Sequence, residues 1–299
     1  MAASLITVPL LVLLHVKSFS IFHDCGHHSY TPSKLLNYVL GILVGVFVNT
    51  PFNWSFIHQV HHMTVGKIDN TYDYPYTDTI FHSVQEYKQF SYPVRQLYKF
   101  FRHPFVFFCV YPVFQFLLVF RFHAFLPKKV AVENMNTFIY VEQIFNDISI
   151  LLLHYIFYKH SILGHYILSH VIASNIGFIL IHIQHAFYPP YIVQKGQEKI
   201  WNVKDSGIKG SSFLQVPFFL RYFTGGIEYH HIHHMNAKIP NYHLRYYHEE
   251  VVSNNNMFDN VVKLSMMDAF RNLWLVLYDE ETNNFVTMAE ANNQRIKVE

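Results

Sequence analysis

Three clusters of histidines, with a spacing that suits metal binding, are the most informative feature of the sequence. In FTGGIEYHHIHHMNAKIPNY, residues 223–242, four histidines fall within five positions. Residues three and four apart are neighbours on a helix, so such a cluster presents three imidazoles on one face. The residues with this spacing are His230, His233 and His234, then His58, His61 and His62, and more loosely His23 and His27. Chance among 22 histidines explains one such motif more easily than three. We therefore predict one shared metal site.

The ligand type and the ligand number say different things about the metal. Neutral imidazole suits iron, copper, zinc and nickel, so the residue type alone does not choose between them. The clusters, with His185 as a possible ninth ligand, offer more nitrogens than the about six positions of an octahedral ion. Two metal ions are therefore predicted. Cys25 and Cys109 lie far apart, which excludes a disulfide framework or a thiolate site.

Other polar residues near the clusters have less specific patterns. A ligating histidine usually donates its second ring nitrogen to a carboxylate or a carbonyl. Candidate partners are Asp24, Asp69, Asp73 and Glu228, although each is equally explained as an ordinary surface carboxylate. Isolated histidines in the apolar stretches lack the cluster spacing and are interpreted as packing residues; they are His15, His154, His165, His170 and His182. His182 and His185 lie three apart, and we favour His185 as a ligand.

The composition indicates which elements position these residues. The chain is 51% hydrophobic and 18% aromatic, with only 14% charged residues, which is typical of an all-α integral membrane protein. The net charge of +2 and the scattered basic residues argue against a nucleic-acid partner. Residues 1–20 lack a basic start and lead directly into the first cluster, so they are predicted to be a membrane helix and not a signal peptide.

Parity of membrane crossings predicts a topology. Residues 35–48 are short for a span, and the clusters on either side must reach one another, so we expect a re-entrant or interfacial helix. Gly41 and Gly45 form a pattern of small residues that favours close helix packing. Residues 65–96 are polar and read as a surface segment. Three apolar stretches follow, at 105–120, 138–158 and 162–183. His185 lies on the same side of the membrane as the second cluster only if the number of crossings between them is even, so one of the three stretches must not cross. Pro112 and the basic residues after it indicate that 105–120 is the stretch that does not cross.

The predicted architecture is one domain over residues 1–299. Residues 1–184 form membrane helices that carry the first two clusters, and residues 185–299 form a cytoplasmic helical cap that carries the third. All clusters then face the cytoplasm. The glycosylation acceptor at Asn53 would be unused on that face.

These motifs resemble the membrane fatty acid desaturases, and within them the acyl-lipid omega-6 (delta-12) type. The similar segments are HDCGHHSY from His23, HQVHH from His58, QHAFYPPY from Gln184, KGSSF from Lys209, FTGGIEYHHIHHMNAKIPNYHL from Phe223 and LVLYDEE from Leu275. The resemblance covers nearly the whole chain. The family commonly begins with a further apolar segment, so by analogy this chain starts within the second helix, with its N-terminus outside.

The resemblance implies a non-haem di-iron enzyme that uses O2 and two electrons to introduce a cis double bond into an acyl chain carried by a lipid or by CoA. The implied ligands are His23, His27, His58, His61, His62, His185, His230, His233 and His234. His28 and His231 are adjacent and are not assigned. His103-Pro104 is followed by Phe105, so the haem-binding H-P-G-G motif is absent from the sequence. By family analogy the electron donor is then a separate b-type cytochrome or ferredoxin, at the endoplasmic reticulum or a bacterial inner membrane.

Two other interpretations stay open at this stage. A hydroxylase, ketolase or acetylenase on the same scaffold would carry the same histidines and differ in its product. A histidine-rich metal transporter would place its ligands near the middle of the membrane, inside the spans. The clusters here begin where the apolar stretches end, which favours the enzyme.

Overall fold

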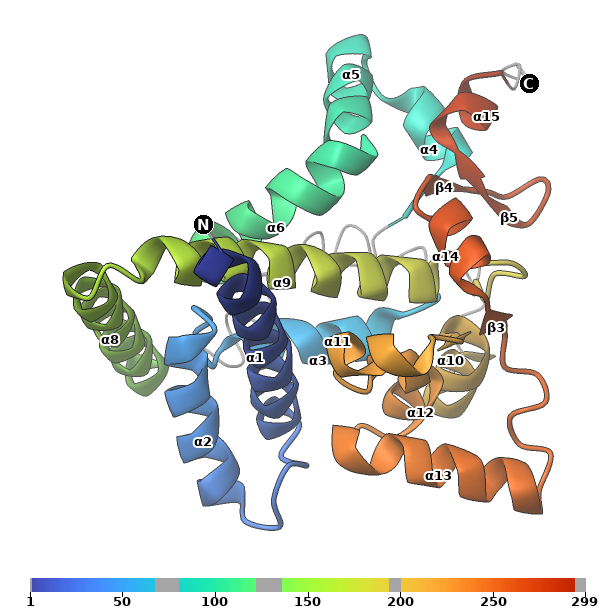
Figure 1. Cartoon of the computed structure of the whole chain (residues 1–299). Helices are drawn as coiled ribbons and strands as arrows, with labels where there is room; N and C mark the ends of the chain where they lie inside the picture. The colour runs from blue at the N-terminus through green and yellow to red at the C-terminus, as the bar shows by residue number, and fades with distance from the viewer. Residues whose placement is uncertain (1, 68–80, 122–135, 194–199, 294–299) are drawn as a thin grey trace.

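The computed structural model describes residues 2–67, 81–121, 136–193 and 200–293, and helices dominate it (Figure 1). The helices and helical turns of the first part are α1 (Ala2–Gly26), α2 (Lys34–Phe47), α3 (Trp54–Thr64), α4 (Val84–Gln89), α5 (Tyr92–Phe101), η2 (Val106–Val110), α6 (Tyr111–Phe114), η3 (Gln115–Val119), α8 (Thr137–Lys159) and α9 (Leu163–His185). Those of the second part are α10 (Val203–Gly210), η6 (Phe218–Leu220), α11 (Arg221–Thr224), η7 (Ile227–Tyr229), α12 (His230–Met235), α13 (Asn241–Asn254), α14 (Met266–Asn272) and α15 (Met288–Asn293). The predicted all-α membrane class is confirmed.

Two of the described helices are long and apolar enough to cross a membrane, Leu5–Gly26 within α1 and Leu163–His185, which is α9. The first continues through the first histidine cluster, beyond the predicted end near residue 20. The helices Tyr92–Phe101 and Val106–Val119 form a pair bent by 62°, as in a broken span or a re-entrant loop. Helix α8 does not meet the same criterion and buries Glu142, Gln143 and Asn146 along one side. We predicted that residues 138–158 cross the membrane and that residues 105–120 do not. By length and composition, the third candidate is instead the bent pair, and α8 is not a candidate.

Helix α2 turns back along α1 and brings the second cluster next to the first. Ser33 caps its start by accepting a hydrogen bond from the Leu36 amide, and the helix is only 14 residues long. Gly41 and Gly45 are buried on it. A Cβ on Gly41 would lie 2.1 Å from the ring of Phe52, and a Cβ on Gly45 would lie 2.6 Å from the Thr50 carbonyl oxygen. The small residues predicted as a packing face therefore allow the close approach that positions α3.

Substituting Gly41 with valine is expected to destabilise this hairpin. The added side chain overlaps Phe52, and overpacking of a filled interior costs about 1–3 kcal/mol. The measurement is the midpoint of thermal unfolding in detergent. Gly164→Ala is the matched control, because a Cβ there meets nothing within 4 Å. Equal midpoints for the two variants would contradict the packing role of Gly41.

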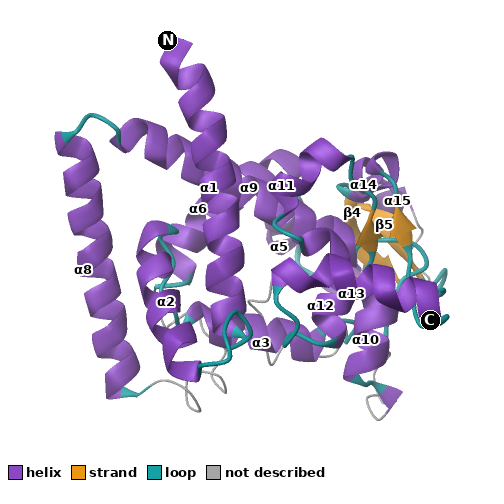
Figure 2. Ribbon diagram, turned by 60° about the horizontal axis from the view of Figure 1, so that its bottom comes forward, coloured by secondary structure: helices purple, strands orange, loops and turns teal. Residues whose placement is uncertain are grey.

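The structure also contains short strands that were not predicted, and Figure 2 colours strands orange. They are β1 (His82–Ser83), β2 (Phe213–Leu214), β3 (Lys263–Leu264), β4 (Leu275–Asp279) and β5 (Asn284–Thr287). β4 pairs in parallel with β1 and antiparallel with β5, and β2 pairs in parallel with β3. The segment LVLYD of β4 is buried at every residue, which explains its apolar composition. The sheet ties the C-terminal end to the segment that precedes α4.

Candidate metal centre

The histidine clusters lie on four elements that meet beside the cytoplasmic end predicted for α1. His23 occupies the last turn of α1, and His27 follows its end. The second cluster lies on α3, and Trp54, the first residue of this helix, stacks on His58 with 4.6 Å between the ring centroids. His185 is the last residue of α9, and the third cluster makes up most of α12. Sequence segments more than 200 residues apart therefore face one another.

Eight of the nine predicted ligands form two buried groups of four, each with its ligand atoms within 4.8 Å of one another. The first group contains His23, His27, His58 and His233, and the second contains His61, His185, His230 and His234. In the first, the Nε2 atoms of His23 and His58 are 2.9 Å apart. In the second, His230 Nε2 lies 2.9 Å from His185 Nε2 and 3.0 Å from His234 Nε2. Each group is thus a set of converging ring nitrogens.

His62, the ninth predicted ligand, lies between the groups. Its Nε2 is 3.1 Å from that of His58 in the first group. Its ring stacks on His234 of the second group, with 4.2 Å between the centroids. The centroids of the His62 and His233 rings lie 4.6 Å apart. His62 is therefore placed where it touches both groups.

Burial favours the neutral form of four of these imidazoles, which is the form that binds a metal ion. Burial lowers the pKa values of His58, His61, His230 and His234 well below the ordinary value of 6.5, because desolvation disfavours the imidazolium form. Neighbouring histidines lower these pKa values further, since two adjacent cations repel. Each ring therefore keeps a free lone pair at neutral pH, which a metal ion requires.

Two contacts orient these rings. His185 Nδ1 donates to the Gly210 carbonyl oxygen at 2.9 Å, which leaves its Nε2 lone pair facing the second group. His23 Nδ1 donates to Asp24 Oδ1 at 3.1 Å in the same manner. The other carboxylate oxygen of Asp24 accepts from both the backbone N and the Nδ2 of Asn241, each at 2.7 Å. Asp24 is buried and links the first cluster to the start of α13, which follows the third.

The donor set fits metal ions. Imidazole nitrogens bind a first-row ion such as Zn²⁺ at about 2.0–2.1 Å, so ligands of one ion lie up to about 4.2 Å apart. The separations within each group are close to this limit. His27 Nε2 and His233 Nε2 are buried and have no hydrogen-bond partner among the described residues. Buried polar atoms of this kind are costly unless a ligand satisfies them. Each group could therefore hold one metal ion.

The remaining histidines and carboxylates of the prediction have other environments. His28 is exposed with φ +52°, and His231 Nε2 lies 3.2 Å from His248 Nδ1; neither residue belongs to the two groups. His182 contacts the Asn272 carbonyl oxygen at 3.1 Å, and His15 donates to the Leu11 carbonyl oxygen. Glu228 is buried and accepts from the Thr224 hydroxyl instead of a cluster histidine. Asp69 and Asp73 lie outside the described residues.

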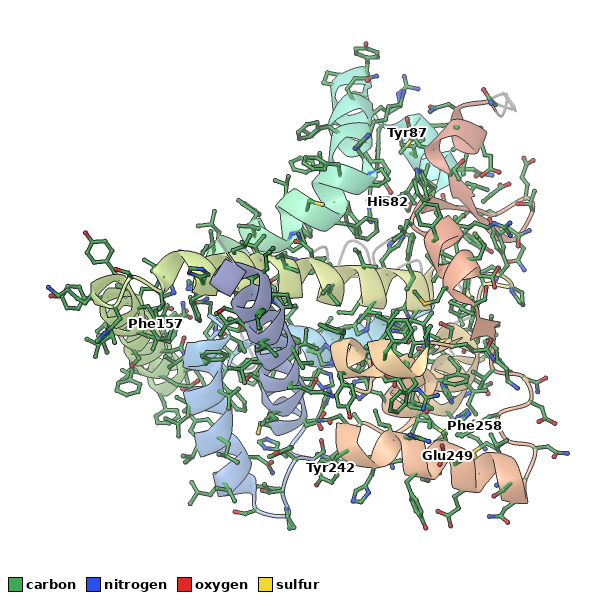
Figure 3. The ribbon with its side chains drawn as sticks, in the orientation of Figure 1. His82, Tyr87, Phe157, Tyr242, Glu249 and Phe258 are labelled. Atoms are coloured by element: carbon green, nitrogen blue, oxygen red, sulfur yellow. The ribbon has the colours of Figure 1, made fainter. Side chains whose placement is uncertain are left out.

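Asn241 and Lys238 make contacts with the first cluster that were not predicted from the sequence. Lys238 Nζ donates to the His27 carbonyl oxygen at 2.5 Å, from the loop between α12 and α13. Figure 3 shows Tyr242, the residue after Asn241, at the end of α13 nearest α1, and its hydroxyl donates to the Tyr30 carbonyl oxygen. The IPNY motif, just after the third cluster, is the sequence feature that could have indicated these contacts. These contacts hold the cap against the first cluster.

His182→Ala is expected to lower stability while leaving the metal content unchanged. The imidazole is buried and joins α9 to α14, so its removal leaves the Asn272 carbonyl unpaired at a cost of about 1–3 kcal/mol. Thermal unfolding and metal analysis by plasma emission spectrometry measure the two effects. A loss of bound metal would mean that His182 and not His185 completes the second group.

An apolar cavity of about 110 Å³ leads away from the histidines. His23, His58, His230 and His233 line it on one side, and α1, α9 and η3 supply most of the rest. Along α1 its lining runs from His23 to His15, eight residues or about 12 Å of helix. Phe19, Phe116 and Phe178 make its wall aromatic. The site thus combines a nitrogen-rich metal centre with a space for an apolar chain.

Comparison with known proteins assigns the chain. The family profile named fatty acid desaturase matches residues 2–258. This protein belongs to the fatty acid desaturase family. It is therefore an oxidoreductase that desaturates fatty acids.

Individual relatives of this desaturase differ in how much they cover. A protein of Bacillus subtilis (strain 168) named fatty acid desaturase is 32% identical over 276 residues, which are 90% of this chain and 73% of that protein. The sn-1 oleoyl-lipid 12-desaturase of Synechocystis sp. is 25% identical over 244 residues, 79% of this chain and 65% of that protein. The sn-1 acyl-lipid omega-3 desaturase (ferredoxin) of Nostoc sp. is 36% identical over 100 residues, 33% of this chain and 25% of that protein.

Proposed function

We propose that this desaturase introduces an omega-6 (delta-12) cis double bond into a monounsaturated acyl lipid, with O2 as the oxidant. The observation that carries the proposal is the apolar cavity whose side is formed by the histidines of both groups. A saturated segment of an acyl chain lying in this cavity would pass directly beside them. The omega-6 position is supported by the C-terminal motifs and by the alignment with an oleoyl-lipid 12-desaturase over 79% of the chain.

The proposed cofactor is a pair of non-haem iron ions held by all nine histidines. The first group would hold one ion, the second group the other, and His62 would lie between them. Iron at these positions would activate O2, with two electrons from the donor, for the removal of two hydrogens from the acyl chain. Burial lowers the pKa values of His58, His61, His230 and His234 and so favours their neutral form. The Gly210 carbonyl would orient His185, and Asp24 would orient His23. Phe19, Phe116 and Phe178 exclude water from the acyl segment.

The proposed setting is one domain over residues 1–299 with its histidines at the cytoplasmic surface of a membrane. His23 and His185 lie at the ends of the two candidate spans, which supports a common face for the clusters. Electrons would come from a ferredoxin or a b-type cytochrome, the donors named for similar desaturases. A relative named for its dependence on ferredoxin supports such a donor.

The test is the fatty-acid profile of cells that express the chain, measured by gas chromatography with mass spectrometry. A new omega-6 dienoic acid is expected with the intact chain and not with an empty vector. A hydroxylated, keto or acetylenic acid in its place would instead assign the reaction to one of the related activities on this scaffold. A membrane-inserted protein with two bound irons that leaves the profile unchanged, with oleoyl lipid and donor supplied, would reject the proposed reaction.

A further inference from the structure

One of the nine predicted ligands reaches the surface of the protein. His62 is partly exposed, whereas the other eight histidines are buried. The same ring touches both groups, with its Nε2 3.1 Å from His58 Nε2 and its centroid 4.2 Å from that of His234. Met63, the next residue on α3, is 50% exposed. The surface beside His62 is therefore where the two groups approach solvent.

The segments that follow α1 and α12 lie side by side at this surface. The centroids of the His62 and His27 rings are 4.8 Å apart, and Lys238 Nζ donates to the His27 carbonyl oxygen at 2.5 Å. Three residues after His27, the Tyr30 carbonyl oxygen accepts from the Tyr242 hydroxyl at 2.9 Å. Figure 3 shows Tyr242 at the end of α13 nearest α1. These contacts join α3 and the two segments into one continuous surface.

This surface is positively charged. Lys34 and Lys238 are exposed, and neither lysine forms an ion pair among the described residues. Burial, followed by the positive charges of these two lysines, lowers the pKa of His28, which places both ammonium groups near its ring. Residues 27–67 and 229–248, the segments that supply the surface, contain no aspartate or glutamate. The two lysines are therefore not neutralised by carboxylates of these segments.

The charged surface lies beyond the end of a candidate membrane span. The span Leu5–Gly26 ends one residue before His27, and Lys34 is the first residue of α2. A water-soluble partner can therefore reach the two lysines. Positive charge steers an acidic protein towards its site and raises the association rate, so the surface fits an acidic partner.

The proposed reaction needs a partner that brings electrons. Removal of two hydrogens from the acyl chain, with reduction of O2 to two waters, takes two further electrons and two protons from solution. A carrier with a one-electron centre is oxidised once at each visit, so two carriers must dock and leave in every turnover. Exposed lysines suit such an exchange, because charges at the rim of an interface mainly raise the association rate and do not make the complex long-lived.

We propose that the surface formed by Lys34, Lys238 and the partly exposed His62 is the docking site of a soluble acidic ferredoxin, which passes its electrons to the metal pair at this point. Each reduced ferredoxin loses one electron, and two ferric ions thereby become ferrous. The inference rests on the proposed function and deepens it, because it gives the electron donor a place on the chain and a charge. We name the ferredoxin as the occupant, since a site beyond the span suits a carrier that diffuses to it and away.

Binding tests the site without relying on activity. Surface plasmon resonance measures the association of a purified [2Fe–2S] ferredoxin with the full chain in phosphatidylcholine nanodiscs. The double variant Lys34→Glu with Lys238→Glu is expected to lower the association rate constant about tenfold at low salt, and the difference should shrink at about 1 M salt. Lys34→Glu alone keeps the contact of Lys238 with His27 and should give a smaller decrease in the same direction.

The matched control for binding is Lys263→Glu. This lysine is exposed on β3, which lies away from α1 in Figure 1. Its substitution changes the net charge as Lys34→Glu does but leaves the proposed surface intact. Equal association rates for Lys34→Glu and Lys263→Glu would overturn the proposal, as would tighter binding of the soluble domain of a b-type cytochrome than of the ferredoxin.

A spin label locates the bound ferredoxin. A nitroxide is attached to Met63→Cys, and for comparison to Met267→Cys, in full-length Cys109→Ser protein, where the remaining Cys25 is buried. Reduced ferredoxin is paramagnetic, so its docking beside His62 should speed the relaxation of the label at 63 and not of the label at 267. Before ferredoxin is added, a water-soluble nickel chelate should reach the label at 63. Protection of that label without ferredoxin, by the bilayer or by a second copy, would overturn the proposal.

Activity separates the docking site from the desaturase function. Iron-loaded protein in nanodiscs that contain oleoyl lipid is supplied with reduced ferredoxin or with a chemical reductant. The double glutamate variant should lose about tenfold in rate with ferredoxin and keep the wild-type rate with the chemical reductant. Equal losses with both donors, or no loss with ferredoxin, would overturn the docking site and leave the desaturase function intact. Absence of product from wild-type protein with either donor would reject the proposed function, while the association rates and the label at 63 would still report whether ferredoxin binds.

Discussion

Replacing His233 with alanine is expected to abolish desaturation and to release iron from the first group. His233 comes from the cap, whereas the other three members of its group come from the N-terminal third of the chain. Its ring lies 4.4 Å from His23 and 4.9 Å from His27, between centroids, and its Nε2 has no hydrogen-bond partner among the described residues. Alanine removes this nitrogen and leaves three ligands facing a gap.

The measurement combines iron analysis of the purified protein with the fatty-acid profile of expressing cells. Bound iron should fall by about half or more, and the new dienoic acid should disappear, since metal binding requires the full ligand set. His243→Ala is the control, because this histidine is exposed on α13 and lies outside both groups. Full activity in the His233 variant would contradict its assignment as a ligand.

Asp24→Ala is expected to reduce activity by about 10- to 100-fold, the usual effect of removing a partner that orients a metal-bound histidine. The substitution leaves His23 Nδ1 without its acceptor and leaves two donors of Asn241 unpaired. Each buried donor left unpaired costs about 1–3 kcal/mol, so the cap should also dock less tightly. The activity of Asp24→Asn should lie between those of the wild type and Asp24→Ala. Its amide oxygen can still accept a hydrogen bond, whereas its NH2 group faces the remaining donors of His23 and Asn241.

Steady-state turnover and iron affinity, measured by competition with a chelator, distinguish these variants. Glu249→Ala provides the matched control, since this carboxylate is exposed on α13 and pairs with Arg245 at 2.7 Å (Figure 3). Such exposed pairs contribute little. If Asp24→Ala and Glu249→Ala had the same activity and iron affinity, Asp24 would have no orienting role.

The convergence of the clusters was predictable from the sequence, but their division into two groups was not. Periodicity places His58 and His61 on neighbouring positions of one helix face, yet they belong to different groups. The division depends on the approach of α9 and α12, which local spacing does not encode. His185 illustrates the same point, because its preference over His182 follows from the carbonyl that each ring meets, at Gly210 and Asn272.

The membrane helices were predicted by composition at α1 and α9 and less well elsewhere. Residues 138–158 appeared to be a span because they are largely apolar, but α8 does not meet the criterion for a span, and Glu142, Gln143 and Asn146 lie together on its buried side. The short strands of the cap were missed because two-residue strands carry no periodic signal, and a fully buried strand such as β4 resembles a helix segment in composition.

Both groups of histidines draw ligands from α12, and this has a consequence for how the protein is made. The ribosome releases His23, His27, His58 and His62 first, and neither group is complete until residues 230–234 have been synthesised and have docked. A partial set of ligands binds a metal more weakly than the full set. If the two groups hold the proposed iron ions, metal insertion is therefore expected late in biogenesis, after the cap has docked on the helices already in the membrane.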